Sequence, residues 1–312
     1  MFFKRAFNRQ RSDVRTSKNY VNPVPFPENE HLETVLSLDT TFGDATFGAY
    51  SLPGRKGEDR MIPGVCVFDD IYMFACIDGH GGMDTAEYLK EALPRVARQL
   101  LKDKIPLNSD ETFKMKNNPS FFQDILKETY EICSREWDNG VHSIPRRKAG
   151  AVATSVLVQD RYCVVAHVGD CRVITVTENG AIKELTREHR ASSPIEQARI
   201  ESLGGRVVSG RVNGLLSPSR AFGDLHVRQM ESGDYSDCIS PVPDLTTFEF
   251  QSNGFLVLSS DGVNDYIRTP ETVNIIQEAL QVDATTAARN LSFAASKLGH
   301  DDITVIVVVW SQ

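Results

Sequence analysis

Apolar residues along this chain gather mainly in short, nearly continuous runs, and such runs are typical of strands that are covered on both faces. The runs that predict strands cover residues 46–51, 64–68, 71–77, 152–158, 162–168, 172–177, 245–250, 255–260 and 303–310. Asp69-Asp70 lies between the second and third runs and predicts a tight hairpin turn. The three runs between residues 152 and 177 follow one another closely, so we expect them to form an antiparallel meander.

In other parts of the chain, apolar residues recur every three or four positions, which predicts amphipathic helices. The expected helices begin near Thr85, Asn118-Pro119, Ser193-Pro194, Thr269-Pro270 and Asp283. Pro94 falls inside the first of them and is expected to break or kink it, because proline has no N–H to donate to the helix. Ser193 and Glu196 have the spacing of a capping box at the start of the third.

The chain is organised as one long region of strands and helices with an extension before it. Its 312 residues and 41% hydrophobic content are enough for a substantial core, in one large domain or two smaller ones. Residues 1–40 include several prolines, so we interpret them as an N-terminal extension and residues 41–312 as the main domain. Residues 206–243 are irregular and rich in Gly, Ser and Asp, which is often the pattern of a functional loop or flap.

Charge is spread unevenly over the chain. The first twenty residues hold six cations and one acid, for a net +5, while the whole chain carries −8, so the remainder carries −13. An acidic body argues against nucleic-acid binding, which depends on clustered Lys and Arg, and it suits metal ions. The basic start lacks the long apolar core of a secretory signal. It fits a mitochondrial presequence, a membrane-surface helix or a disordered basic tail.

Cysteine usage and hydropathy indicate the compartment. The six cysteines lie far apart, form no CxxC pair and mostly fall in apolar runs, so we expect reduced thiols in an intracellular, cytoplasmic protein. No run reaches the roughly 18 consecutive apolar residues of a membrane span. We therefore expect no transmembrane segment.

Carboxylates stand at the ends of three predicted strands. Asp78 and Asp261 each follow an apolar run and precede a glycine, and Asp301 stands just before the last run. Taken singly, each is explained by a turn that the carboxylate caps. Strands of one layer bring their ends together, however, so the three could form one cluster, in which like charges repel unless cations neutralise them. Oxygen-only sites of this kind suit Mg²⁺ or Mn²⁺, and no His/Cys set has zinc spacing.

Two divalent ions held by such carboxylates would lower the pKa of a bound water and polarise a phosphoryl oxygen, which permits direct hydrolysis of a phosphate ester. The sequence has no GxSxG or CxxxxxR nucleophile motif that would compete with this chemistry. It also has no P-loop and no kinase glycine loop. The residues therefore favour metal-dependent hydrolysis of phosphate esters.

Six motifs in fixed order closely resemble those of the type 2C metal-dependent Ser/Thr protein phosphatases, and together they cover about residues 43–310. They are Asp78-Gly79-His80-Gly81-Gly82, Val168-Gly169-Asp170-Cys171-Arg172, Leu185-Thr186-Arg187-Glu188-His189, Arg211-Val212-Asn213-Gly214-Leu215 with Ser219-Arg220-Ala221-Phe222-Gly223-Asp224, Ser260-Asp261-Gly262 with Asp265, and Asp301-Asp302-Ile303-Thr304-Val305. The resemblance implies an α+β fold, namely an α-β-β-α sandwich of two antiparallel sheets flanked by helices, with a metal site at one end. Residues 206–243 would then be the flap that shapes substrate choice.

The resemblance also implies metal ligands. Asp78 would bridge two Mg²⁺ or Mn²⁺ ions, the carbonyl of Gly79 would be a further ligand, and Asp261 and Asp301 would complete one of the two sites.

Residues from other motifs would complete the metal centre. Glu58 would serve the second site, and Asp59 would hold metal-bound waters. Asp170 and Asp265 match a weaker position for a third metal.

Two further roles follow from the resemblance. His80 would be the general acid that protonates the leaving seryl or threonyl oxygen. Arg55 would clamp the phosphate, because a guanidinium binds two phosphate oxygens at once. Family members usually place this arginine four residues before the glutamate, whereas Arg55 lies three before Glu58 and Gly54 takes the expected place. Lys56 is therefore a substitute candidate.

Two other departures from the family pattern leave the implied ligands intact. Gly150 opens a segment that lacks the usual hydroxyl residues, and Asn264 replaces a common Trp. Because all the matched acids are present, we expect an active, monomeric phosphatase that acts on phosphoprotein substrates. The alternatives are a phosphatase-like binding or scaffold protein without turnover, and a phosphodiesterase or nuclease with the same metals, which the acidic body disfavours.

Overall fold

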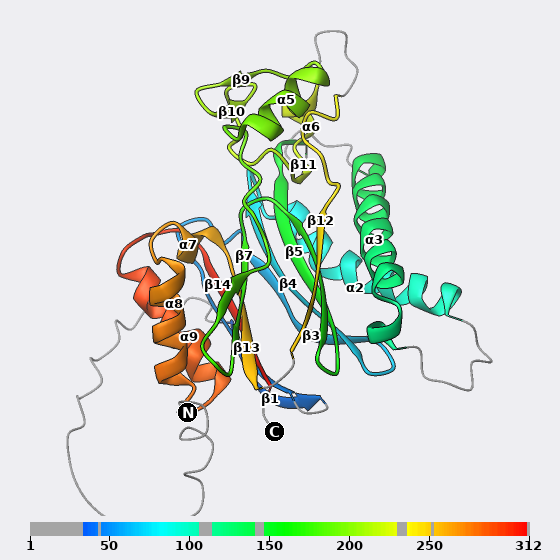
Figure 1. The fold of residues 1–312 in the computed structure, drawn as a ribbon. Coiled ribbons are helices and arrows are strands. Elements are labelled where there is room, and N and C mark those ends of the chain that lie inside the picture. Colours follow the sequence, from blue (N-terminus) through cyan, green and yellow to red (C-terminus); the bar gives the residue numbers. More distant parts are fainter. Residues whose placement is uncertain are drawn as a thin grey trace, which may run out of the picture.

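Two six-stranded antiparallel sheets stack face to face at the centre of the computed structural model (Figure 1). The structure describes residues 34–42, 45–105, 114–140, 147–229, 236–250 and 253–310. The first sheet has the order β1 (Thr34–Phe42), β2 (Ala45–Leu52), β14 (Ile303–Trp310), β13 (Gly254–Ser259), β7 (Arg172–Thr177) and β8 (Ile182–Glu184). The second has the order β12 (Asp244–Glu249), β6 (Tyr162–Val168), β5 (Gly150–Gln159), β4 (Ile71–His80) and β3 (Arg60–Phe68), with β11 (Phe222–Gly223) beside β5.

Helices cover the outer face of each sheet. α2 (Asp84–Lys104) and α3 (Pro119–Gly140) pack on the second sheet, and α8 (Thr269–Ala279) and α9 (Ala284–Ser296) pack on the first. The shorter elements are the 3₁₀ turn Met115–Asn117, α5 (Pro194–Ser202), α6 (Leu225–Arg228) and α7 (Asp261–Asn264). The predicted α-β-β-α sandwich is therefore confirmed.

Large side chains fill the space between the two sheets. Phe47 and Phe74 meet edge to face with ring centroids 5.2 Å apart, and Phe250 stacks on Trp310 at 4.2 Å. Trp310 donates from Nε1 to the carbonyl of Asp160 at 2.7 Å, so its polar group is satisfied inside the core. Dense packing of this kind fixes the sheets relative to each other and so fixes the positions of their strand ends.

α2 continues through Pro94, so the helix is not broken there, which was one of the two outcomes that the sequence predicted. Proline removes one hydrogen bond from the helix interior, to the carbonyl of Lys90. Leu93, Val96 and Ala97 are nevertheless buried in the cluster that joins α2 to the second sheet. Tertiary packing therefore holds the helix together across the missing bond.

The expected meander between residues 152 and 177 is wrong at its third strand. β5 and β6 form a hairpin in the second sheet, but β7 pairs with β13 and β8 in the first sheet. Gly169 adopts φ 102° at the crossing, and a Cβ there would lie 2.2 Å from the side chain of Val152, so only glycine fits. The crossing carries the next residue, Asp170, from one sheet toward the other.

Residues 206–243 stand with α5 at one end of the sandwich (Figure 1). Their described part contains a ribbon of β9 (Val207–Val208) and β10 (Arg211–Val212), followed by β11 and α6. Glu196 of α5 is 4% exposed and accepts hydrogen bonds from Ser219 Oγ at 2.8 Å and from Arg220 at 2.7 Å. Ser193 makes no side-chain cap bond, so the expected capping box is absent and Glu196 instead ties α5 to the flap.

The structure also bears on the cysteine thiols, the N-terminal extension and the expected absence of a transmembrane segment. All six cysteines are free, and Cys66 is the exposed one among them. β1 begins at Thr34, inside the predicted extension, and residues 1–33 lie outside the described part of the chain. Across the described residues, every helix is too short or too polar to cross a membrane.

Candidate metal centre

Three aspartates from three strand ends meet at the end of the sandwich that carries the flap. Asp78 lies near the end of β4, Asp170 follows β6 at the crossing between sheets, and Asp261 follows β13. Each offers a carboxylate oxygen, and these three oxygens lie within 4.8 Å of one another. Asp301, expected in this cluster, lies close enough to Asp261 to raise its pKa but is not one of the three.

Burial and mutual repulsion disfavour the charged forms of these carboxyls. Burial holds the pKa of Asp78 well above its ordinary value, and the charges of Asp59 and Asp261 raise it further. Burial also raises the pKa of Asp170 to about 7, with a further contribution from Asp261. The pKa of Asp59 rises to about 8, again chiefly through burial. Such groups exist together as carboxylates only when cations neutralise them.

Glu58 lies next to this cluster. A Cβ at Gly79 would lie 2.5 Å from the carbonyl oxygen of Glu58, so the two backbones touch. Oε1 of Glu58 accepts a hydrogen bond from the N–H of Gly82 at 2.8 Å, while Oε2 is buried and accepts none from the described residues. This oxygen lies 3.9 Å from Nζ of Lys56. A buried carboxylate oxygen beside three aspartates belongs to a donor set that Mg²⁺ or Mn²⁺ prefers, so the residues fit these ions.

The carboxylate of Asp302, which had no role in the sequence analysis, holds the loop that carries Glu58. It accepts hydrogen bonds from the backbone N–H groups of Gly54, Gly57 (3.1 Å), Glu58 (2.5 Å) and Asp59 (3.2 Å). A Cβ at Gly54 would lie 2.4 Å from the carbonyl carbon of Asp301. The close approach explains why glycine stands where the resemblance expects arginine. Arg55 is displaced by one position, and its side chain is exposed.

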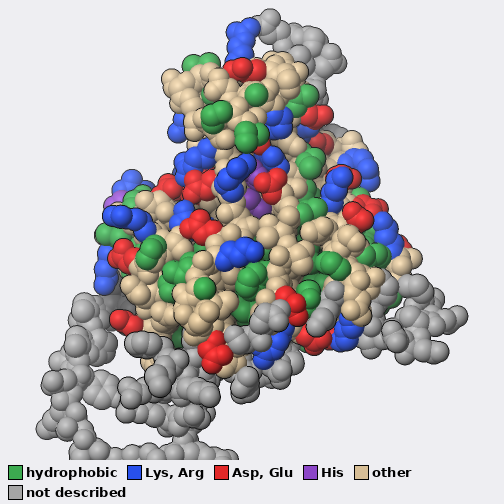
Figure 2. All heavy atoms as spheres, viewed as in Figure 1, with side chains coloured by type: hydrophobic (Ala, Val, Ile, Leu, Met, Phe, Trp, Pro, Cys, Tyr) green, Lys and Arg blue, Asp and Glu red, His purple; other side chains and the backbone are tan. Residues whose placement is uncertain are grey.

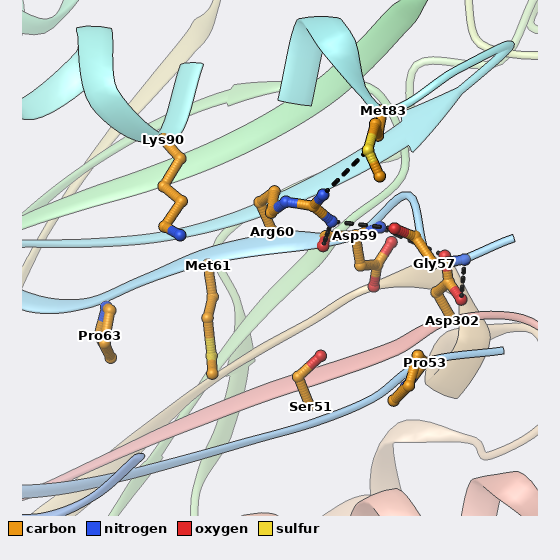
Figure 3. Close-up of a pocket in the computed structure, with 10 residues that line it drawn as sticks. All are labelled: Ser51, Pro53, Gly57, Asp59, Arg60, Met61, Pro63, Met83, Lys90 and Asp302. Carbon is orange, nitrogen blue, oxygen red and sulfur yellow. Dashed lines mark hydrogen bonds between the residues drawn. The ribbon is translucent and has the colours of Figure 1, made fainter. Parts of the chain in front are cut away.

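The same loop is held on its other side by Arg60, beside a cavity of about 330 Å³ (Figure 3). Arg60 donates to the carbonyl oxygens of Gly57 at 2.9 Å and of Asp59 at 2.7 Å, and Figure 3 shows its guanidinium between Met83 and the loop. Asp59 and Asp302 also line the cavity. Asp302 thus accepts hydrogen bonds from the N–H groups of the loop, and Arg60 donates hydrogen bonds to its carbonyls. These contacts fix Glu58 and Asp59 although the loop has no regular secondary structure.

His80, at the end of β4, faces a buried carboxylate from the flap. Its Nε2 lies 2.8 Å from Oδ2 of Asp224, which is 1% exposed and begins α6 at φ 55°. Burial alone would lower the pKa of His80, but the charge and hydrogen bond of Asp224 outweigh it and raise the pKa. A Cβ at Gly150 would lie 2.2 Å from Oδ2 of Asp224 and 2.4 Å from Nε2 of His80, so this pair requires the glycine.

Comparison with known proteins decides which family has this arrangement. A family model described as protein phosphatase 2C matches residues 67–303, which is more than half of the chain. The chain belongs to the protein phosphatase 2C family. A probable protein phosphatase 2C 32 of Oryza sativa subsp. japonica is 32% identical over 267 residues, which cover 82% of this chain and 62% of that protein. This chain therefore spans less than two thirds of that relative.

Other phosphatases match over larger shares. A probable protein phosphatase 2C 27 of the same rice is 31% identical and covers 93% of this chain and 84% of that protein. Protein phosphatase 1L of Bos taurus is 29% identical, with coverage of 89% and 76%. The crystal structure of a serine-threonine phosphatase 2C from Toxoplasma gondii has a TM-score of 0.73 at 20% identity, with coverage of 90% and 99%. At that identity the likeness shows a shared fold.

In this phosphatase 2C chain, the two residues expected at a third metal position differ in burial, although the charge of Asp265 contributes to the raised pKa of Asp170. Asp170 belongs to the buried cluster, whereas Asp265 is exposed. Arg190 lies 3.2 Å from Oδ1 of Asp265, and its Nε donates to Glu188 at 2.6 Å. Figure 2 shows acidic and basic side chains intermingled where the flap meets the sandwich. A protein cation therefore already neutralises part of the rim around the buried acids.

The phosphatase 2C motifs contain functional residues that the sequence analysis quoted without a role. Asp224 and Asp302 both stand inside quoted motifs, and motif membership was the only signal that could have found them. Asn264, the other departure from the family, closes the turn after β13: Ser259 Oγ donates to its Oδ1 at 2.8 Å, and its Nδ2 donates to the carbonyl of Ser259 at 3.0 Å. The turn that begins with Asp261 is thus ordered without the usual tryptophan.

Proposed function

We propose that this chain is a Mg²⁺- or Mn²⁺-dependent protein phosphatase that hydrolyses phosphoserine and phosphothreonine by attack of water, without a covalent intermediate. The observation that carries the proposal is the meeting of Asp78, Asp170 and Asp261 at one buried point, with pKa values raised by burial and mutual charge. Two ions bound there would supply Lewis acidity and a water of lowered pKa.

The ligand assignment extends the predictions from sequence. Asp78 would bridge both ions, and the carbonyl of Gly79 would be a further ligand. Asp261 and Asp301 would complete one site, and Glu58 would serve the other. Asp59 would orient water at this pair. Asp170 and Asp265 would serve a weaker third ion.

The other proposed roles belong to side chains outside the ligand set. His80 donates a proton to the leaving oxygen, and Asp224 holds its ring at 2.8 Å in one orientation. Arg55 binds the phosphate oxygens, with Lys56 as the alternative. Both side chains are exposed, and Nζ of Lys56 lies 3.9 Å from Oε2 of Glu58. We also propose that the protein is a cytoplasmic monomer whose substrates are phosphoproteins.

Metal removal and ligand substitution test this function. Purified protein is expected to hydrolyse a phosphothreonine peptide with added Mn²⁺ and to lose this activity in EDTA. Asp78→Asn and Asp261→Asn are each expected to lower kcat/KM on the order of 100-fold or more, because each removes a ligand. Asp103→Asn, an exposed change on α2, is the matched control and is expected to keep full activity.

The scaffold alternative gives a different result. A phosphatase-like binding protein would bind Mn²⁺ in isothermal titration calorimetry yet turn over no phosphopeptide. Hydrolysis that persists in excess EDTA would refute the metal-dependent reaction. No observation in the described residues favours loss of activity.

A further inference from the structure

The first sheet has an open edge at β8. Leu185 donates its backbone N–H to β7 at 2.8 Å, and Lys183 lies opposite Thr175 in the same ladder. Since backbone groups alternate in direction along a strand, those of Ile182 and Glu184 point away from β7. Within the described part of the chain, no strand pairs with this side of β8. Such an edge can pair with another extended chain.

A groove of about 560 Å³ runs along this edge. Ile182 and Glu184 line it from β8, and Asn264 and Arg268 line it from the region of α7 and α8. In Figure 1 the hairpin of β7 and β8 lies at the front of the sandwich, beside α7 and α8. Ile182 is apolar yet 42% exposed, so the groove offers an apolar contact next to the outward-pointing backbone groups of β8.

Among the described residues, one cation that lines the groove is left without a partner. The guanidinium of Arg268 is exposed and makes no ion pair or hydrogen bond with the described residues. The other arginine in the groove, Arg172, is already paired with Glu188 at 3.0 Å. Glu184 accepts a hydrogen bond from Thr269 at 2.5 Å. An acidic side chain on a bound chain would therefore complement Arg268.

The groove begins beside the metal centre. Arg172 follows Asp170 by two positions, and Asn264 follows Asp261 by three, so two residues that line the groove are joined by a few bonds to two of the clustered acids. A polypeptide with one side chain at the acid cluster can thus continue along β8.

We propose that this groove binds the phosphoprotein substrate itself. Residues next to the phosphorylated side chain add to the edge of β8 as an extra strand, and an acidic residue among them pairs with Arg268. The inference rests on the proposed phosphatase function, to which it adds a substrate class: phosphoproteins whose phosphorylated residue stands in an extended, acidic segment.

Peptide chemistry tests the added strand on the unaltered protein. The probes are phosphothreonine dodecapeptides whose flanking residues are either acidic or alanine. Each peptide is also made in two N-methylated forms, one methylated on the odd-numbered residues and one on the even-numbered residues. We expect kcat/KM to be about fivefold higher for the acidic flank. N-methylation in one register is expected to lower kcat/KM about tenfold, with little effect in the other register, because only one set of N–H groups faces β8. Equal effects of the two registers would overturn the added strand.

Charge reversal tests the partner of the acidic residue. Arg268→Glu is expected to remove the preference for the acidic flank and to favour a lysine flank, while hydrolysis of p-nitrophenyl phosphate stays unchanged. Lys102→Glu, the same charge change on α2 at the other sheet, is the control. Equal effects of the two variants on peptide selectivity would overturn the role of Arg268, and melting temperatures show that both variants are folded.

A binding measurement separates this proposal from the phosphatase function. Fluorescence anisotropy with the dephosphorylated peptides and Mn²⁺ requires no turnover. Register-dependent binding without hydrolysis of any phosphate ester would support the groove and refute the phosphatase. Hydrolysis in the presence of metal without any dependence on flank or register would refute the groove alone.

Discussion

Carboxyl groups of this chain differ in what surrounds them, and this difference sets their chemistry. Asp302 accepts hydrogen bonds from four backbone N–H groups of the loop that carries Glu58. Asp78 instead faces Asp59 and Asp261, and its pKa is raised. Backbone donors thus surround one aspartate and other acids surround the second, so a bound cation would favour the charged form of Asp78.

The raised pKa values predict how the stability of the metal-free protein depends on pH. Folded Asp170 and Asp59 hold their protons up to about pH 7 and 8, whereas unfolded aspartate loses its proton near pH 4. Stability therefore falls as the pH rises through this window, by about 1.4 kcal/mol per pH unit for each carboxyl still protonated in the folded state. In calorimetry with EDTA, the melting temperature is expected to fall from pH 5 to pH 8.

Bound Mn²⁺ is expected to reverse this trend, because it favours the ionised carboxylates. The added ion then raises the melting temperature more at pH 7.5 than at pH 5. Asp78→Asn, which removes one charge from the cluster, is expected to flatten the metal-free slope. A metal-free melting temperature that rises with pH would contradict the raised pKa values.

The pairing of His80 with Asp224 predicts a change in the pH profile of catalysis. The carboxylate of Asp224 raises the pKa of His80, so the protonated imidazole persists to higher pH. Asp224→Asn is expected to lower this pKa and to move the alkaline limb of kcat toward lower pH for phosphopeptides. For p-nitrophenyl phosphate the change is expected to be smaller, because its leaving group needs less protonation. Identical shifts for both substrates would remove the general-acid role.

At the scale of elements, the loop of residues 53–59 shows how one irregular segment is made rigid. Asp302 binds its N–H groups, Arg60 binds its carbonyls, and Gly54 allows it to touch the backbone of Asp301. The loop can therefore present Glu58 and Asp59 in fixed positions.

Gly54→Ala tests this contact. The new Cβ would overlap the backbone at 2.4 Å, so we expect a loss of about 1–3 kcal/mol in the free energy of unfolding and weaker Mn²⁺ binding by calorimetry. Gly140→Ala is the matched control, because a Cβ there has open space around it. If both variants have the same Mn²⁺ affinity, the loop does not depend on the close approach.

The same scale shows what the sequence could predict. Short apolar runs located β4, β13 and β14 well, because burial on both faces leaves a direct pattern in the residues. The edge strand β3 is largely half-buried, and it begins at Arg60, four residues before the predicted run. The pattern does not record which sheet a strand joins, and so β7 was misplaced. Long-range partners were also missed: Asp224 meets His80 from 144 residues away, and no local signal predicts that contact.

At the scale of the whole molecule, the flap is joined to the sandwich by a chain of charged groups. Glu196 of α5 pairs with Arg220, and Arg220 pairs with Asp244 of β12 at 2.8 Å. Asp244 in turn lies 3.1 Å from Nε2 of His189. The hydrogen bonds from Arg220 and Ser219 outweigh the burial of Glu196 and lower its pKa to about 2. Arg220 of the flap therefore connects it both to α5, through Glu196, and to β12, through Asp244.

Arg220→Ala is expected to loosen this attachment, because it removes the link to Asp244 and leaves Glu196 with Arg199 as its remaining cation. We expect a loss of about 2–3 kcal/mol in the free energy of unfolding and faster proteolysis within residues 206–243. Arg211→Ala, an exposed arginine of the same flap, is the control. Equal protease sensitivity of the two variants would contradict the anchoring role.

β14 follows all the other described elements along the chain, yet it lies in the middle of the first sheet, between β2 and β13. Until residues 303–310 are in place, no hydrogen-bonded ladder joins β2 to β13. Asp302, just ahead of β14, also cannot be fixed beside the loop of residues 53–59. On the ribosome, residues 303–310 must therefore emerge before the first sheet can close and before the loop of residues 53–59 can be held in place.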